Sequence, residues 1–166
     1  MKKIFLFFFL LLSCSMEAQI TRTINGITLG KSTRQDVIRF LQKNNTNYQT
    51  VEGGSAIAGY GLLYFGQTEW NKVCFRFYKN LVFQICYEKR GLASEGSTIV
   101  LEYAAIRQIL MKKYSRYYHP FPGSTSFSDG KTNLHLGGGT PGTTQEMYIW
   151  YTDAALVKKH NNDLGF

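Results

Sequence analysis

Cysteine and histidine are the side chains of this chain best suited to act as nucleophiles, bases or metal ligands. Three of each are present: Cys14, Cys74, Cys86, His119, His135 and His160. No two histidines are four residues apart, which is the spacing that places two imidazoles on one helical face for a metal ion. No Gly-x-Ser-x-Gly motif is present to form a nucleophile elbow. We therefore expect no catalytic residue, metal or cofactor, and a small hydrolase is the least favoured function.

Cys74 and Cys86 lie in a predicted hairpin, so their relation depends on its register. A three-residue loop over 78–80 would pair Phe75 with Phe83 and leave the two cysteines diagonal on one face. A register shifted by two residues would place them directly opposite each other. Cross-strand cysteines form a disulfide only if their Cα atoms lie within about 7 Å. The sequence leaves open a disulfide or two half-buried thiols.

Two glycine-rich segments approach the pattern of phosphate-binding loops. The first, Gly26 to Ser32, has only three residues between its glycines, where a P-loop has four. Asn25 stands where the first P-loop glycine belongs, so we expect a loop that leads into a capped helix. The second, Gly137 to Thr144, has backbone amides that could face an anion. It is more simply a long loop that joins two strands.

The segment from Lys112 to Pro122 combines positive charge with aromatic rings. Its residues of interest are Lys112, Lys113, Tyr114, Arg116, Tyr117, Tyr118 and Phe121. Tyrosines beside arginine are typical of interfaces with proteins or sugars, and the charge would suit an anionic partner. We expect the first candidate binding surface here. The alternative is a helix end whose tyrosines cover the edge of a sheet.

Two helices are predicted from capping patterns and helical spacing. The first begins at a capping box of Ser32 and Gln35 and ends near Asn44. The second has Ser97 as its N-cap and ends at the two lysines that open the basic segment, where cations suit a helix C-terminus. Their apolar faces comprise Val37, Phe40 and Leu41 in the first helix and Ile99, Tyr103, Ile106 and Leu110 in the second.

The other predicted elements are antiparallel strands. Residues 71–88 form a hairpin, in which apolar residues alternate with more polar ones on both strands: Val73, Phe75, Phe77, Phe83, Ile85 and Tyr87. Asp129-Gly130 is a two-residue turn between strands 124–128 and 131–136. The last strand covers 147–152, and the tail 158–166 is expected to be loose.

The order helix, strands, helix, strands predicts an α+β fold, in which two helices pack on one face of an antiparallel sheet. The same order also resembles a degenerate tandem repeat, in which each unit is a helix followed by strands. We place a single domain at residues 19–157, because 148 residues after the first eighteen are enough for one proper core and too few for two.

Residues 26–37 read Gly-Ile-Thr-Leu-Gly-Lys-Ser-Thr-Arg-Gln-Asp-Val and lead into an apolar helix and later a phenylalanine-rich hairpin. In this the chain resembles the small outer-membrane-assembly lipoproteins (BamE-like) and the related β-lactamase-inhibitor-like folds. The resemblance covers residues 26–44 and, by pattern, 71–88. It implies a non-enzymatic protein that binds other proteins. The chain differs from the assembly lipoproteins in its second helix and in Asn44-Asn45-Thr46, where they carry Gly-x-Pro.

Residues 1–18 have the form of a cleavable export signal. Lys2 and Lys3 precede the apolar run Ile4 to Leu12, which is too short to span a bilayer as a helix. Two processing routes stay open. Cleavage after Ala18 would release the domain, whereas the sequence that ends at Cys14 resembles the lipobox at which bacterial lipoproteins are acylated. A lipid on Cys14 would tether the domain to a membrane.

Export and charge limit the classes of partner. Without residues 1–18 the chain has seventeen basic and ten acidic side chains, a net charge of +7. Such a positive charge either attracts anionic partners or serves only to aid solubility. Nucleic acid is a poor candidate partner, because an exported protein does not meet it. We expect a periplasmic or cell-surface protein, or an outer-membrane-anchored lipoprotein, that binds a protein partner or anionic envelope material. An inhibitor-like or glycan-binding protein that uses residues 112–122 is the alternative.

Overall fold

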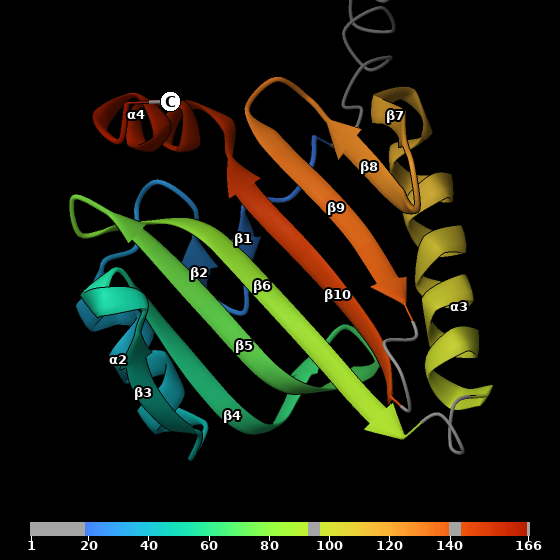
Figure 1. Cartoon of the computed structure of the whole chain (residues 1–166), viewed down its shortest axis with the longest axis horizontal. Helices are drawn as coiled ribbons and strands as arrows, with labels where there is room; N and C mark the ends of the chain where they lie inside the picture. The colour runs from blue at the N-terminus through green and yellow to red at the C-terminus, as the bar shows by residue number, and fades with distance from the viewer. Residues whose placement is uncertain (1–18, 93–96, 140–143, 166) are drawn as a thin grey trace, which may run out of the picture.

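The computed structural model describes residues 19–92, 97–139 and 144–165. Its centre is an eight-stranded antiparallel sheet with the strand order β3-β4-β5-β6-β10-β9-β8-β7 (Figure 1). The strands are β3 (Asn47–Val51), β4 (Ala56–Phe65), β5 (Thr68–Tyr78), β6 (Leu81–Leu92), β7 (Tyr118–Phe121), β8 (Ser124–Ser128), β9 (Thr132–Gly139) and β10 (Thr144–Asp153). A short ribbon precedes them, made of β1 (Thr23–Ile24) and β2 (Ile27–Thr28). The helices are α2 (Arg34–Lys43), α3 (Ser97–Tyr114) and α4 (Ala154–Asp163), with single 3-10 turns η1 (Glu52–Gly54) and η3 (Ser115–Tyr117).

The chain builds this sheet from two successive halves. Helix α2 is followed by β3 to β6, and α3 is followed by β7 to β10. Within each half, every strand pairs antiparallel with the next one along the chain. The halves join at the middle of the sheet, where their last strands, β6 and β10, pair with each other. The predicted α+β fold is confirmed, and each half has a helix followed by four strands.

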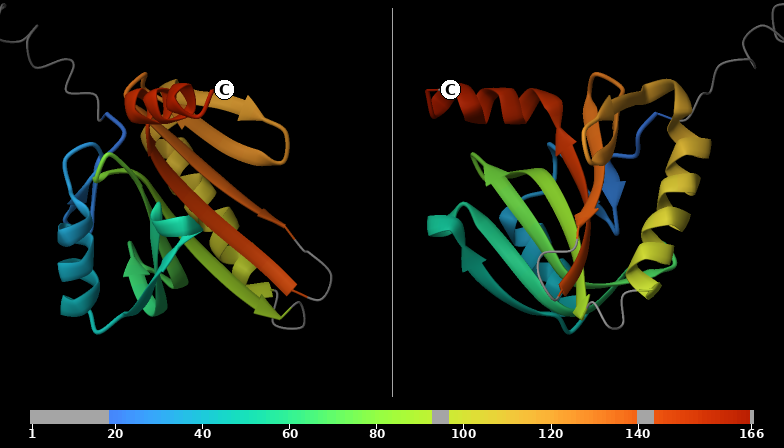
Figure 2. Two further views of the ribbon diagram at one scale, coloured as in Figure 1. Left: turned by 60° about the vertical axis from the view of Figure 1, so that its left-hand side comes forward. Right: turned by 45° about the vertical axis from the view of Figure 1, so that its right-hand side comes forward.

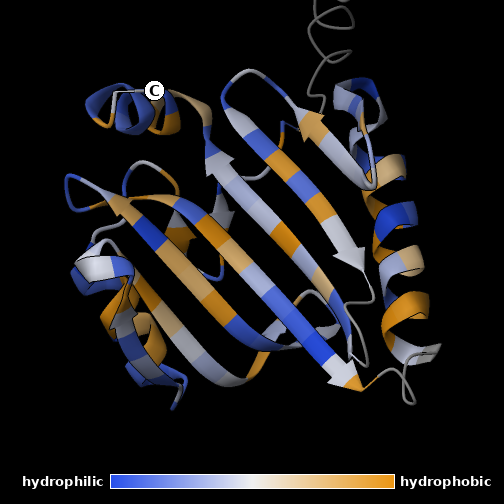
Figure 3. Cartoon of the chain, in the orientation of Figure 1, coloured by the Kyte–Doolittle hydropathy of each residue, from blue (hydrophilic) through white to orange (hydrophobic). Residues whose placement is uncertain are grey.

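Helices α2 and α3 lie on the same face of the sheet, together with the β1–β2 ribbon (Figure 2). Apolar and polar residues alternate along strands such as β9, as a sheet with one buried face requires (Figure 3). Val37 and Leu41 of α2, and Ile99 and Leu110 of α3, enter the same buried cluster as the apolar residues of the strands. The core therefore lies between the sheet and these two helices, and the opposite face is left for other uses.

The start of α2 differs by one residue from the prediction. The side chain of Thr33 accepts a hydrogen bond from the amide of Asp36, and the carboxylate of Asp36 accepts one from the amide of Thr33. The capping box is therefore Thr33 and Asp36, and these hydrogen bonds lower the pKa of Asp36. Ser32 instead accepts a hydrogen bond from the amide of Thr28 at 2.9 Å, which closes the preceding turn.

The β5–β6 hairpin has a different register from the predicted one. The turn is formed by two residues, Lys79 and Asn80, both with positive φ (46° and 69°), and no three-residue loop is present. A bulge follows, because Arg76 pairs with Gln84 while the next residue of β5 pairs with Val82. The extra residue, Phe83, leaves the apolar alternation, while Ile85 and Tyr87 stay on the core face as predicted.

The prediction of a loose tail over residues 158–166 is wrong for residues 158–163, which belong to α4. Asp153 caps this helix by accepting a hydrogen bond from the amide of Leu156 at 2.8 Å. The ring of His160 packs against Phe83, with 5.0 Å between ring centroids. Helix α4 therefore lies over the end of the sheet face that α2 and α3 leave open (Figures 1 and 2).

The β8–β9 connection is longer than the predicted two-residue turn. Ser128 and Asn133 are the last paired residues, and the carboxylate of Asp129 accepts hydrogen bonds from the amides of Lys131 (2.9 Å) and Thr132 (2.7 Å). The predicted loop over 137–144 is also shorter, because residues 137–139 complete β9 and Thr144 begins β10.

Candidate functional site

The face of the sheet opposite α2 and α3, which we call the open face, carries the candidate site. The strand register places side chains of successive strands in rows across it. One row comprises Ser126, His135, Trp150, Cys86, Cys74 and Ala58, and the next comprises Gly137, Tyr148, Glu88, Lys72 and Tyr60. The half of the face formed by β3 to β6 is thus rich in small and charged residues, and the half formed by β7 to β10 is aromatic.

Four rings on the second half contact one another and form what we call the aromatic cluster: Phe121, His135, Tyr148 and Trp150. Tyr148 and Trp150 stack with 4.9 Å between centroids and 23° between planes, and His135 stacks on Trp150 at 5.3 Å. Phe121 meets His135 edge-on at 6.0 Å. The cluster is partly open to solvent, since Phe121 is 62% and Trp150 is 36% exposed.

Gly137 fixes the position of Tyr148 in this cluster. The two residues are direct partners on β9 and β10. A Cβ atom at position 137 would lie 2.3 Å from the Tyr148 ring, so the ring occupies the space that any other side chain would fill. The missing side chain therefore lets the tyrosine ring lie against the backbone of the neighbouring strand.

His135 is held in the cluster by a hydrogen bond as well as by stacking. Its Nδ1 atom lies 2.7 Å from the hydroxyl oxygen of Ser126, the adjacent residue on β8. Burial lowers the pKa of His135, so the neutral ring is favoured at neutral pH. Serine and histidine are the types of a nucleophile and its base. Among the described residues, however, no carboxylate forms a hydrogen bond with His135 to orient it.

Charged side chains on the open face occur as ion pairs. Lys72 binds Glu88 with 3.0 Å between Nζ and Oε2, and Arg90 binds Glu146 with 3.2 Å between Nε and Oε2. Both pairs lie beside Tyr148, because Glu88 is its partner on β6 and Glu146 precedes it by two residues. The aromatic cluster therefore has a polar border with little net charge.

Cys74 and Cys86 are direct cross-strand partners on the open face, so the diagonal arrangement is wrong and the alternative that places them opposite each other is the one found. The two-residue turn and the bulge at Phe83 together account for this register. Both cysteines are free thiols, 9% and 8% exposed, and burial raises the pKa of each. They behave here as small apolar residues that cluster with Ala56, and Tyr148 packs against this cluster.

The predicted surface over residues 112–122 is divided among different surroundings. Tyr114 is buried in the core against Phe127, so its assignment to a binding surface is wrong. Tyr117 and Tyr118 pack against the same core, which matches the alternative that tyrosines cover the sheet edge. Lys112, Lys113 and Arg116 stay exposed at the end of α3 and in η3. Phe121 alone among the predicted residues joins the aromatic cluster.

The backbone amides of the P-loop-like segment, residues 26–32, form hydrogen bonds within the fold. The amide of Gly30 donates to the carbonyl of Val82 at 2.8 Å, and the amides of Lys31 and Ser32 both donate to the carbonyl of Thr28. These amides are therefore not free to bind a phosphate, and the predicted loop into a capped helix is confirmed.

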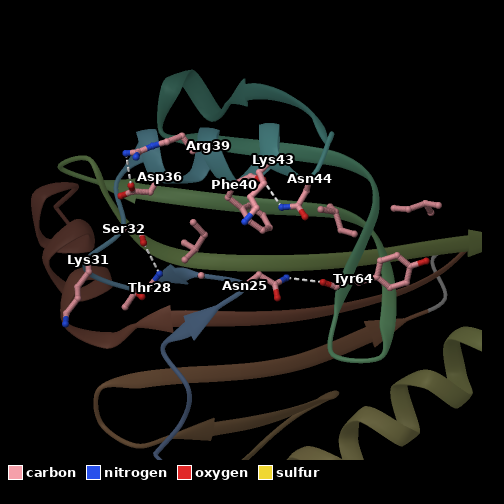
Figure 4. A pocket seen from close by; sticks show the side chains of 14 residues that line it. Asn25, Thr28, Lys31, Ser32, Asp36, Arg39, Phe40, Lys43, Asn44 and Tyr64 are labelled. Atoms are coloured by element: carbon pink, nitrogen blue, oxygen red, sulfur yellow. Dashed lines mark hydrogen bonds and ion pairs between the residues drawn. The ribbon is translucent and has the colours of Figure 1, made fainter.

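A broad hollow of about 910 Å³ lies beside this segment, between α2, the β1–β2 ribbon and β4 (Figure 4). Its polar side chains form hydrogen bonds and ion pairs with other residues of the fold. The amide of Asn25 donates to the carbonyl of Tyr64 at 3.0 Å, and Arg39 pairs with Asp36 at 3.0 Å. The hollow is open to solvent, its lining is polar and apolar in about equal parts, and its described residues form no set with evident chemistry.

Other classes of site find little support in the described residues. No group of three or more histidine, cysteine, aspartate or glutamate side chains in residues 19–92, 97–139 and 144–165 could hold a metal ion. Within the same residues, no helix has the length and apolar character needed to cross a membrane. Cys14 and the predicted export signal lie outside the described part of the chain.

Comparisons with protein-family models, with curated proteins and with solved structures found no match to this chain.

The aromatic cluster was missed by the sequence analysis except for Phe121. A signal for it exists in the last strand, where Tyr148, Trp150 and Thr152 alternate with Met147, Ile149 and Tyr151. Both series contain large apolar or aromatic side chains, so period alone does not tell which of them faces the core. His135 lies on the face of its strand away from the core, and its ring partners lie on other strands, so spacing along its own strand does not reveal the cluster.

Proposed function

We propose that this protein is a non-enzymatic binding module that holds a protein partner against its open face. The observation that carries the proposal is the aromatic cluster, in which four rings pack together on a sheet face that α2 and α3 do not cover. Exposed aromatic residues that are mutually supported are typical of the energetically dominant part of protein interfaces. Stacking against each other also limits their rotamer freedom, which reduces the entropy lost on binding.

The border of the cluster supports a protein rather than an ionic partner. The charges beside Tyr148 are paired with each other, so no excess of either sign faces the ligand. A centre of aromatic residues inside a polar border is the common arrangement of a protein interface. The resemblance to envelope proteins that bind other proteins is consistent with the same function.

We also propose an exported location, from residues 1–18. Their basic start, short apolar run and small-residue end have the pattern of a signal peptide. The mature protein would then work in the periplasm or at the cell surface, either free or anchored through Cys14. Intact mass and N-terminal analysis of the protein from its native cells distinguishes a chain that starts at Gln19 from an acylated one that starts at Cys14. An N-terminus at Met1 would contradict export.

A glycan is the second candidate ligand, and the near-parallel stack of His135, Tyr148 and Trp150 favours it. Flat, amphipathic rings beside hydrogen-bonding side chains suit the mixed polar and apolar surface of a sugar. In contrast to the sequence-based alternative, this hypothesis uses β9 and β10 and not residues 112–122.

Photocrosslinking tests which face binds. We would replace Phe121 by p-benzoylphenylalanine and, as a matched control, replace Tyr64, which is 63% exposed beside the hollow of Figure 4. Irradiation in native cells should yield a discrete adduct from position 121, with tryptic peptides of a second protein, and no adduct from position 64. An adduct that contains no peptides of a second protein and loses its added mass on periodate treatment would overturn the protein partner in favour of a glycan. Equal adducts from both positions would reject the open face.

A further inference from the structure

A second cavity lies on the opposite side of the sheet from the aromatic cluster. It has a volume of about 610 Å³, is partly open to solvent, and lies between α3, the tip of the β4–β5 hairpin and the core face of β10. Such a volume is within the range of sites for small molecules, about 300–1,000 Å³. Its walls are mostly apolar or aromatic and include Phe65, Trp70, Ile106, Leu110, Ile149 and Tyr151.

Tyr151 contributes a hydroxyl group to this mostly apolar wall. Its side chain is only 3% exposed, and its hydroxyl group forms no hydrogen bond with any residue that the structure describes. The two neighbouring buried tyrosines are both partnered: Tyr87 accepts a hydrogen bond from Asn25 at 3.0 Å, and Tyr114 accepts one from the amide of Thr21 at 3.4 Å. The Tyr151 hydroxyl is therefore a hydrogen-bonding group in the cavity wall that no described protein group uses, so it is available to a ligand.

The charges around the cavity do not favour an ion. Glu102 and Lys113 both line it, and they have opposite signs. Glu102 is already paired with Lys89, with 2.8 Å between Oε2 and Nζ, and Lys113 lies over the ring of Tyr114 at 5.1 Å. A neutral ligand therefore fits these walls better than a fatty acid or another anion.

We infer that this cavity is a binding site for a small, mostly apolar, neutral molecule that carries a hydroxyl or carbonyl oxygen, which forms a hydrogen bond with Tyr151. The apolar walls take up the body of the molecule, and the oxygen supplies the partner that the tyrosine hydroxyl otherwise lacks. The site does not depend on the proposed function, because it shares no residue with the open face.

A matched pair of probes, 1-naphthol and naphthalene, tests the inference, since they differ by one hydroxyl group. In amide NMR titrations of the full domain, 1-naphthol should give saturable shifts in α3 and at the β4–β5 tip. The conservative variant Tyr151→Phe should bind 1-naphthol about three- to tenfold more weakly, as expected for one neutral hydrogen bond. Its affinity for naphthalene should be unchanged.

A second variant controls for the location of binding. Ala105 is an exposed residue of α3 that lines the cavity, so Ala105→Trp should fill the space and abolish saturable binding of both probes while the far-UV spectrum stays native. Equal affinity of wild type and Tyr151→Phe for 1-naphthol would overturn the role of the hydroxyl. The inference would also be rejected if 1-naphthol gave no saturable shifts, or if Ala105→Trp bound it as well as wild type.

Discussion

At the scale of single residues, His135 is a titratable side chain whose ring also packs in the aromatic cluster. Its ring contacts Phe121, Tyr148 and Trp150, and its Nδ1 atom shares a hydrogen bond with Ser126. The ring is half-buried, and this burial lowers its pKa. Protonation would therefore place a charge among four aromatic and hydroxyl-bearing neighbours that are arranged around a neutral imidazole.

The lowered pKa of His135 predicts a stability loss in mild acid. The unfolded chain takes up the proton near the ordinary histidine pKa of about 6.5, while the folded chain resists it, so the free energy of unfolding falls as pH falls through that range. Urea unfolding at pH 7.5 and 5.5 should show a smaller difference in His135→Gln than in wild type. Asp36 and Glu52, whose pKa values are also lowered, lose their contribution only at lower pH. Identical pH slopes in the two proteins would contradict this role.

The raised pKa values of Cys74 and Cys86 predict slow thiol chemistry. Because the thiolate is the reactive form and both side chains are buried, iodoacetamide at pH 8 should modify them slowly in the native protein and rapidly in urea. Peptide mass spectrometry measures the extent of modification at each of the two cysteines separately. Rapid modification of either one without denaturant would show that the thiols are not held as the structure has them.

At the scale of elements, Asp153 connects the last helix to the first residues of the domain. One carboxylate oxygen caps α4, and the other forms an ion pair with Arg22, whose guanidinium also donates to the carbonyls of Leu29 and Lys131. Gly30, with φ of +73°, lies so close that a Cβ atom there would be 2.7 Å from the Asp153 carboxylate. This junction fixes α4 over the end of the open face.

Substitution Asp153→Ala should lower the free energy of unfolding by about 2–3 kcal/mol, because it removes a helix cap and leaves the Arg22 guanidinium without its carboxylate. Chemical denaturation followed by circular dichroism measures the loss. The matched control is Asp163→Ala at the other end of α4, where the carboxylate is itself exposed, pairs with half-buried Tyr78 and exposed Lys79, and should matter much less. Equal losses of unfolding free energy in the two variants would show that Asp153 contributes no more to stability than the exposed carboxylate of Asp163.

The elements also show where prediction from the sequence succeeded and failed. The helix periods of α2 and α3, and the strand alternation around Val73 and Ile85, depend on local spacing and were predicted correctly. The bulge places Phe83 against His160, which is 77 positions later, so the alternation of residues within the hairpin could not reveal this contact. Helix α4 was missed because its cap, Asp153, reads as the end of a strand.

At the scale of the whole molecule, the two halves share one sheet and one core. The central pairing of β6 with β10 joins them, and residues of both helices belong to the same buried cluster. The order of helices and strands was enough to predict the α+β class. The open face could not be predicted in the same way, because its rows bring together residues from strands on both sides of the β6–β10 junction, which depends on long-range pairing.

The shared core predicts that the protein unfolds as a single unit. Trp70 lies in the core of the first half and Trp150 on the open face of the second. Thermal unfolding of Trp70→Phe and Trp150→Phe, each read by the fluorescence of the remaining tryptophan, should coincide with the loss of far-UV ellipticity. Separate transitions in either variant would show that the halves are independent domains.

The affinity of the partner identified by crosslinking, measured by calorimetry with purified proteins, tests the proposed role of the open face most directly. Trp150→Ala and Tyr148→Ala should each weaken binding at least about tenfold, as expected for central aromatic residues of an interface. Tyr64→Ala removes an aromatic side chain that is more exposed than Trp150 and lies beside the hollow of Figure 4, and it should leave the dissociation constant unchanged. Unchanged binding by Trp150→Ala and Tyr148→Ala, in proteins that remain folded, would contradict the account.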